Sequence, residues 1–147
     1  MAYCSQADVE IAAGGARALV ELCDLDGARS GTVNATVLAA AIADADALID
    51  SYVAKQRAVP LNPVPAVVRR VSAEETVHAL RCRRQIVGEY EDQRHENNVR
   101  WLEGVAKGLI TLGVDPQPAK SALVAPAVVT VDDSEREITA FNTRGIW

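Results

Sequence analysis

Two residues with metal-binding side chains, His78 and Cys82, lie four positions apart in a segment that we expect to be helical. This spacing places both side chains on one face of a helix, as in some zinc sites. Two ligands do not complete such a site, and His95 lies in a different segment without a partner pattern. Burial of His78 on the core face, with Glu75 as its hydrogen-bond partner, is the simpler explanation. The sequence therefore predicts no metal and no cofactor.

An acidic segment formed by Asp24, Asp26 and Gly27 has some features of a calcium loop. An EF-hand, however, needs glycine at its sixth position and glutamate at its twelfth. The twelfth position is Ala35 when counted from Asp24, and Val37 when counted from Asp26. A polar turn explains the segment better, because aspartate bonds its own backbone and glycine accepts a positive φ.

The usual sequence motifs of an enzyme are absent. There is no GxSxG, no phosphate-binding glycine loop and no HExxH. Gly14 and Gly15 are better explained as a break between two helices. Since no nucleophile, base and oxyanion donor form a recognisable set, we expect a protein without catalytic activity.

Charged residues of opposite sign lie on two predicted helices. The acidic group comprises Asp44, Asp46 and Asp50, and the basic group comprises Arg69, Arg70, Arg81, Arg83 and Arg84. A solvated face explains the acidic group, and contact with arginines of a neighbouring subunit is the alternative. For the basic group, the net charge of −5 and the lack of interleaved aromatic residues favour contact with protein over contact with DNA. Our hypothesis assigns both groups to a subunit interface.

The composition is that of one small domain. The chain has 147 residues, of which 49% are hydrophobic and only 4% aromatic, so alanine, valine and leucine must build the core. Its pI near 5.0 argues against a general nucleic-acid binder. The three cysteines show no CxxC spacing, so we expect reduced thiols. With no secretion signal and no apolar run of about 18 residues, we expect a soluble cytoplasmic chain without membrane contact.

Helix signals predict an all-α fold, a small bundle of about four helices with an extended C-terminal arm. Ser5 is placed to cap a short first helix, and Asn34 to cap the clearest one. The expected helices after the first are 16–23, 35–57, 66–87 and one that ends near Gly113. Prolines at 60, 63 and 65 form the connection before the helix 66–87. The polar stretch 88–98 is a loop or the first turns of the last helix.

Apolar periodicity predicts the core residues of these helices. They are Ile42, Ile49, Tyr52, Val67, Val71, Trp101, Leu102, Val105 and Leu109. On the helix 66–87, Val67, Cys82 and Ile86 share the expected core face. Residues 1–114 form the predicted helical domain, and 115–147 form the arm, with a possible short strand near 127–131. The arm ends in apolar rings, which is typical of a segment that docks on a partner.

Three stretches resemble the Mu-type head–tail connector family of tailed phages and prophages. The first is the alanine–aspartate helix 41–52 with the proline-rich link 59–65 and Val68-Arg69-Arg70 behind it. The second is 101–108 with Leu112-Gly113-Val114. The third is the end of the chain, 141–147, which is similar to the family's terminal signature of phenylalanine, Arg-Gly and an aromatic residue.

This resemblance implies a structural subunit of the phage neck. About twelve copies would form a ring beneath the portal that joins head to tail and extends the DNA channel. The implied partners are other copies of the chain, the portal protein, a tail-terminator or other neck protein, and passing double-stranded DNA without sequence-specific contact. The implied location is the virion, after assembly in the host bacterial cytoplasm. The residues expected to dock the arm are Phe141, Arg144, Ile146 and Trp147. The alternative is a small helical DNA-binding or regulatory module that uses the helix carrying Arg69–Arg84.

Overall fold

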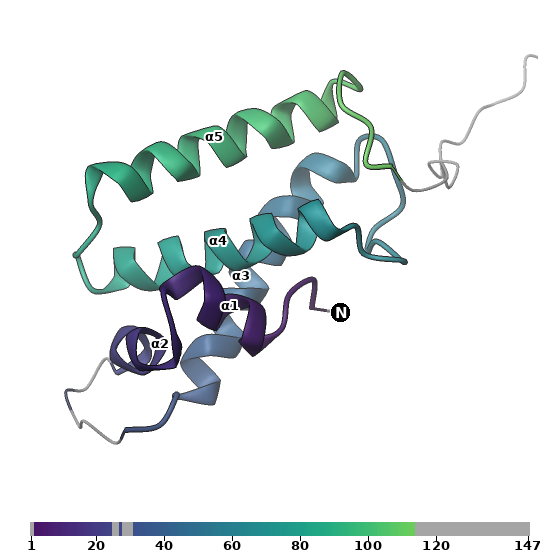
Figure 1. The fold of residues 1–147 in the computed structure, drawn as a ribbon. Coiled ribbons are helices and arrows are strands. Elements are labelled where there is room, and N and C mark those ends of the chain that lie inside the picture. Colours follow the sequence, from purple (N-terminus) through teal and green to yellow (C-terminus); the bar gives the residue numbers. More distant parts are fainter. Residues whose placement is uncertain (1, 25–26, 28–30, 114–147) are drawn as a thin grey trace, which may run out of the picture.

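The computed structural model describes residues 2–24, 27 and 31–113, and the regular secondary structure in this part of the chain is all helical, without strands (Figure 1). Its helices are α1 (Gln6–Ala13), α2 (Ala16–Cys23), α3 (Ala35–Val53), α4 (Ala66–Arg83) and α5 (Glu89–Ala106). Helix α4 lies at the centre and contacts each of the other four helices. The predicted small all-α bundle is confirmed, with five helices in the described part where about four were expected.

Side-chain caps define where the first and third helices begin. The Asp8 backbone N–H donates to Ser5 Oγ, and the Ser5 N–H donates to the Asp8 carboxylate at 2.8 Å. Asn34 Oδ1 accepts from the N–H groups of Thr36 and Val37 at the start of α3. These contacts satisfy N–H groups that have no partner within the helix. Both caps lie where the sequence predicted them.

The later helices differ from expectation mainly at their ends. Helix α3 ends at Val53 and α4 at Arg83, each four residues before the predicted end. The polar stretch after Gly88 forms the first turns of α5. The acidic side chains of Glu89, Glu91 and Asp92 stabilise this end of the helix, because it carries the positive end of the helix dipole. Figure 1 shows α4 and α5 side by side as an antiparallel pair.

Two apolar clusters make up the core. One joins α1 and α2 to the start of α3 and the second half of α4, and includes Leu19, Leu38 and Leu80. The other joins the end of α3 to the start of α4 and the second half of α5, and includes Ile49 and Leu102. Helix α4 contributes to both clusters, which explains why it is buried from more than one side.

The predicted core residues divide into three groups. Ile49, Val71, Leu102 and Val105 are buried, whereas Ile42, Tyr52 and Trp101 are partly buried against the two clusters. The predictions that Val67 and Leu109 are core residues are wrong, because these residues are 43% and 79% exposed. Val67 lies beside the true inner face of α4, which also buries Ser72, Glu75 and Thr76, and Leu109 lies beyond the end of α5.

Several predictions lie outside the described residues. They are Asp26 of the acidic turn, the domain boundary at 114/115, the possible strand near 127–131 and the docking residues Phe141, Arg144, Ile146 and Trp147. None of the described helices has the length and apolar character needed to cross a bilayer.

Candidate functional site

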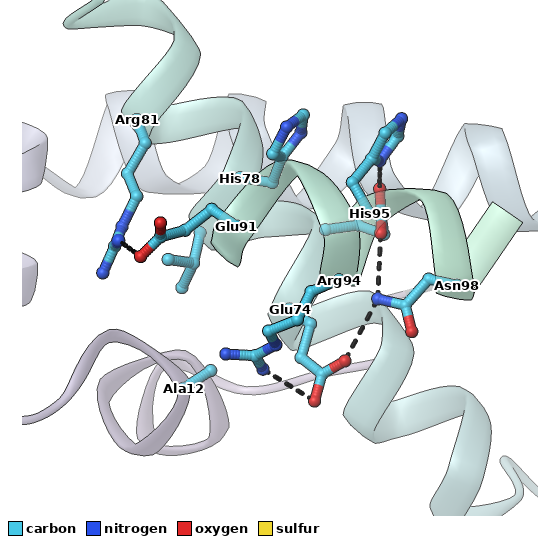
Figure 2. Close-up of a pocket in the computed structure, with 10 residues that line it drawn as sticks. Ala12, Glu74, His78, Arg81, Glu91, Arg94, His95 and Asn98 are labelled. Atoms are coloured by element: carbon cyan, nitrogen blue, oxygen red, sulfur yellow. Dashed lines mark hydrogen bonds and ion pairs between the residues drawn. The ribbon is translucent and has the colours of Figure 1, made fainter. Parts of the chain in front are cut away.

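The first half of α5 packs on α4 through charged and polar side chains (Figure 2). Arg94 pairs with Glu74 at 2.8 Å, and Arg81 pairs with Glu91. The amide nitrogen of Asn98 donates to both Glu74 and Glu75 at 3.0 Å. Apolar contacts of α5 with the core begin only further along the helix, in the second cluster. The α4–α5 pair is therefore held by polar contacts at one end and by apolar packing at the other.

Two histidine rings lie at the centre of this polar contact. The rings of His78 and His95 stack with centroids 4.3 Å apart and planes only 3° from parallel. Each ring contacts a carboxylate on the other helix. His95 Nδ1 lies 2.7 Å from Glu75 Oε2, and His78 Nε2 lies 3.4 Å from Asp92 Oδ1. A small cavity of about 20 Å³ adjoins Glu75 and both rings. We call Glu75, His78, Asp92 and His95 the histidine cluster.

The cluster corrects two sequence predictions. Glu75 does not bond to His78, the partner expected one turn away on the same helix; it contacts His95 on α5. Cys82 is exposed and does not face the core, although its Sγ lies 3.7 Å from His78 Nε2. His95, for which the sequence shows no partner pattern, stacks on His78 and contacts Glu75.

A repeated spacing could have identified this cluster from the sequence. Glu75 precedes His78 by three positions, and Asp92 precedes His95 by three. On two antiparallel helices, such acid-x-x-His pairs can face one another, because residues three apart share a helix face. The repeat is hard to recognise in the sequence because Asp92 and His95 lie in the polar stretch 88–98, which the sequence does not identify clearly as helix.

A second polar cluster fixes the start of the chain to α3. The carboxylate of Asp46, only 9% exposed, accepts from the Tyr3 backbone N–H at 3.1 Å and from Ser72 Oγ at 2.7 Å. The Tyr3 hydroxyl donates to Asp50 and accepts from the Leu61 N–H. Burial, followed by the hydrogen bond to Asp50, raises the pKa of Tyr3 well above its ordinary value. These carboxylates therefore have partners within the chain.

Four of the remaining residues assigned to a subunit interface, Asp44, Arg81, Arg83 and Arg84, also have partners within the chain. Asp44 pairs with Arg83 at 2.8 Å across α3 and α4. Arg84 donates to the backbone carbonyl of Glu21. Arg69 and Arg70 are exposed on α4. The opposite charges of Asp44 and Arg83 thus join two helices of one subunit.

Large apolar side chains are exposed at both ends of the α4–α5 pair. Ile86 is 55% exposed and Tyr90 68% exposed, around the turn between the two helices. Leu109 is 79% exposed and lies just past the far end of α5. At 1.5 Å per residue, the 18 residues of α5 separate these surfaces by about 27 Å. We call them the turn surface (Ile86, Tyr90) and the far surface (Leu109, Ile110).

Comparison with known proteins relates the chain to proteins of Mu-like phages. It is 37% identical over 84 residues to "Gene product J" of Escherichia phage Mu, a match that covers 55% of this chain and 56% of the relative. It is 36% identical over 74 residues to "Mu-like prophage FluMu protein gp36" of Haemophilus influenzae, covering 50% of this chain and 51% of the relative. The chain thus spans about half the length of the curated relatives it matches.

The model of the family described as "Bacteriophage Mu, Gp36" matches residues 3–130. This range includes all five helices of the described part, together with the caps, the histidine cluster and the Asp46 contacts. The chain therefore belongs to the bacteriophage Mu Gp36 family.

Proposed function

We propose that this chain is a structural subunit of a tailed-phage neck. About twelve copies form a ring beneath the portal that joins head to tail and extends the DNA channel. The ring contacts the portal protein on one side and a tail-terminator or other neck protein on the other, and DNA passes through it without sequence-specific contact. The role is structural and involves no catalysis. It places the protein in the neck of the virion.

The observation that carries this proposal is the pair of exposed apolar surfaces at opposite ends of one helix pair. A subunit of a cyclic ring contacts its two neighbours through two different surfaces, one on each side. The turn surface and the far surface are distinct and well separated, as such a head-to-tail contact requires. Membership of a family of Mu-like phage proteins supports the same assignment.

The contacts of the basic helix favour the structural role over DNA binding. Arg81, Arg83 and Arg84 are engaged with Glu91, Asp44 and the Glu21 carbonyl. A DNA-binding module would therefore rely on Arg69 and Arg70. Two phosphate contacts would give only a shallow dependence of affinity on salt, with a slope of roughly 2 on a double-logarithmic plot.

Cosedimentation with DNA-filled, tailless heads of the same phage tests the proposal. The full chain is expected to sediment with heads that carry a portal and not with portal-free shells. A chain that ends at Ala140, and so lacks Phe141–Trp147, should keep its helical circular dichroism but lose head binding, because the arm is proposed to dock on the portal or a neighbour. Failure of the folded full chain to bind heads would refute the connector role.

A further inference from the structure

We propose that the α4–α5 pair binds one divalent transition-metal ion of the zinc type through Glu75, His78 and His95. The inference is independent of the neck role, because it rests only on contacts within one subunit. Imidazole nitrogen and carboxylate oxygen are the ligands that zinc, cobalt and nickel ions accept together, whereas calcium and magnesium prefer oxygen alone. The donor atoms therefore define the class of ion.

The candidate ligand atoms lie close together in the structure. One donor atom from each of Glu75, His78 and His95 lies within 4.8 Å of the others. Around a tetrahedral zinc ion with bonds of about 2.0–2.1 Å, ligand atoms lie about 3.4 Å apart. The ligand atoms would therefore have to move closer by up to about 1.4 Å, a shift within the reach of side-chain rotation. The adjoining cavity of about 20 Å³ gives space at this point.

A second layer of contacts holds the carboxylate in place. Asn98 donates to Glu75 Oε1 at 3.0 Å, which leaves Oε2 turned toward His95 Nδ1 at 2.7 Å. Glu75 is only 4% exposed, so its position is set by the packing of α4 and α5. Hydrogen-bonded support of this kind is a regular feature of metal-binding carboxylates.

The fourth coordination position has two candidate donors beside the same nitrogen. Asp92 Oδ1 lies 3.4 Å and Cys82 Sγ 3.7 Å from His78 Nε2. The Asp92 side chain is 62% exposed and is free to turn toward an ion. The four residues of the histidine cluster then supply two acid-x-x-His pairs from facing helices, an arrangement that also occurs at metal sites in helical bundles.

Both histidines of the chain belong to this cluster. A single hydrogen bond to the buried Glu75 would require only His95, so that role leaves the stacked His78 ring unexplained. A bound ion would join α4 to the half of α5 that lacks apolar packing on the core. It would fix the relative position of α4 and α5, between which the turn surface lies.

Cobalt titration of the full chain, purified without a histidine tag and stripped by a chelator, tests the site. Visible absorption reports tetrahedral cobalt, and thermal melting reports stabilisation, since an ion that binds only the folded chain raises its melting temperature. The variants are His78→Asn and His95→Asn, each compared with Gln93→Ala, a change at an exposed position of α5. Cys82→Ser and Asp92→Asn identify the fourth ligand.

The expected result is saturable binding of one cobalt ion per chain. Each histidine variant should weaken it at least about tenfold, whereas Gln93→Ala should leave it unchanged. Zinc should compete for the same site, and magnesium should not. The proposal is overturned if the folded chain binds no cobalt saturably, or if both histidine variants bind it as the unmodified chain does.

Discussion

The backbone N–H of Tyr3 donates to the buried carboxylate of Asp46 over 3.1 Å, and so joins the start of the chain to the middle of α3. The other carboxylate oxygen accepts from Ser72 Oγ on α4 at 2.7 Å. Asp46 therefore connects three parts of the fold through one side chain. A buried carboxylate is stable only when its oxygens are hydrogen-bonded in this way.

Substitution Asp46→Ala should lower the free energy of unfolding by about 2 kcal/mol, because the Tyr3 N–H and the Ser72 hydroxyl lose a buried acceptor. Urea denaturation measures the effect. The matched control is Asp44→Ala on the same helix, which breaks an exposed ion pair with Arg83 and should cost less than about 1 kcal/mol. Equal losses of stability for the two variants would show that the hydrogen bonds of Asp46 to Tyr3 and Ser72 do not stabilise the fold as proposed.

Alkaline pH should destabilise the fold through Tyr3. Its pKa is raised by burial and by the bond to Asp50, so the folded state retains the hydroxyl proton more tightly than the unfolded chain does. This contribution is fully present below the unfolded pKa of about 10 and is lost as the pH rises toward the higher folded pKa.

The measurement is the free energy of unfolding between pH 8 and about pH 11, compared for the unmodified chain and Tyr3→Phe. The variant should lose less stability across this range, because it lacks the Tyr3 hydroxyl. Tyr52 and Tyr90 are present in both chains, so the difference between the two profiles reports Tyr3 alone. Identical pH profiles would remove Tyr3 from this role.

Two leucines near the end of α5 should differ sharply when truncated. Leu102 is fully buried in the second apolar cluster, so Leu102→Ala should cost about 2–5 kcal/mol. Leu109 is 79% exposed, so Leu109→Ala should change the stability of the subunit by no more than about 0.5 kcal/mol. Thermal or urea unfolding distinguishes these outcomes, and a large loss for Leu109→Ala would place that residue in the core after all.

Local signals predicted most helix starts well. Ser5 and Asn34 cap helices in the structure because their side chains satisfy N–H groups within a few residues, a relationship that the sequence contains. The segment Ala16–Cys23 is helical with the bounds that were expected. The end of α4 was placed too late, because nothing in 84–87 ends a helix as clearly as proline does.

The inner face of α4 could not be predicted from apolar periodicity. That face also buries Ser72 and Thr76, whose partners lie far away in the sequence or on the same helix. A prediction from apolar residues alone therefore places the inner face of α4 too close to Val67 and Ile86, which are exposed. The burial of Asp46 is not predictable for the same reason, because it depends on hydrogen-bond donors from Tyr3 and Ser72, which are distant in the sequence.

The proposed head-to-tail contact makes a prediction for mixtures of variants. Tyr90→Asp disrupts the turn surface and Leu109→Asp the far surface, so either chain alone should fail to assemble. An equal mixture should form a heterodimer, because one intact surface of each kind remains to form a single contact. Native mass spectrometry measures this, with the exposed change Asn97→Asp as the control. A mixture that remains monomeric while the unmodified chain assembles would contradict the head-to-tail contact.

Imaging of the portal vertex tests whether the chain forms a ring between head and tail. Tailless heads are incubated with the purified full chain, and the vertex is reconstructed by electron cryomicroscopy with and without the chain. We expect an added ring of about twelve helical subunits beneath the portal, with the turn surface of one subunit against the far surface of the next. A vertex that is unchanged by a chain shown to be folded, or a chain bound elsewhere on the head, would contradict the connector role.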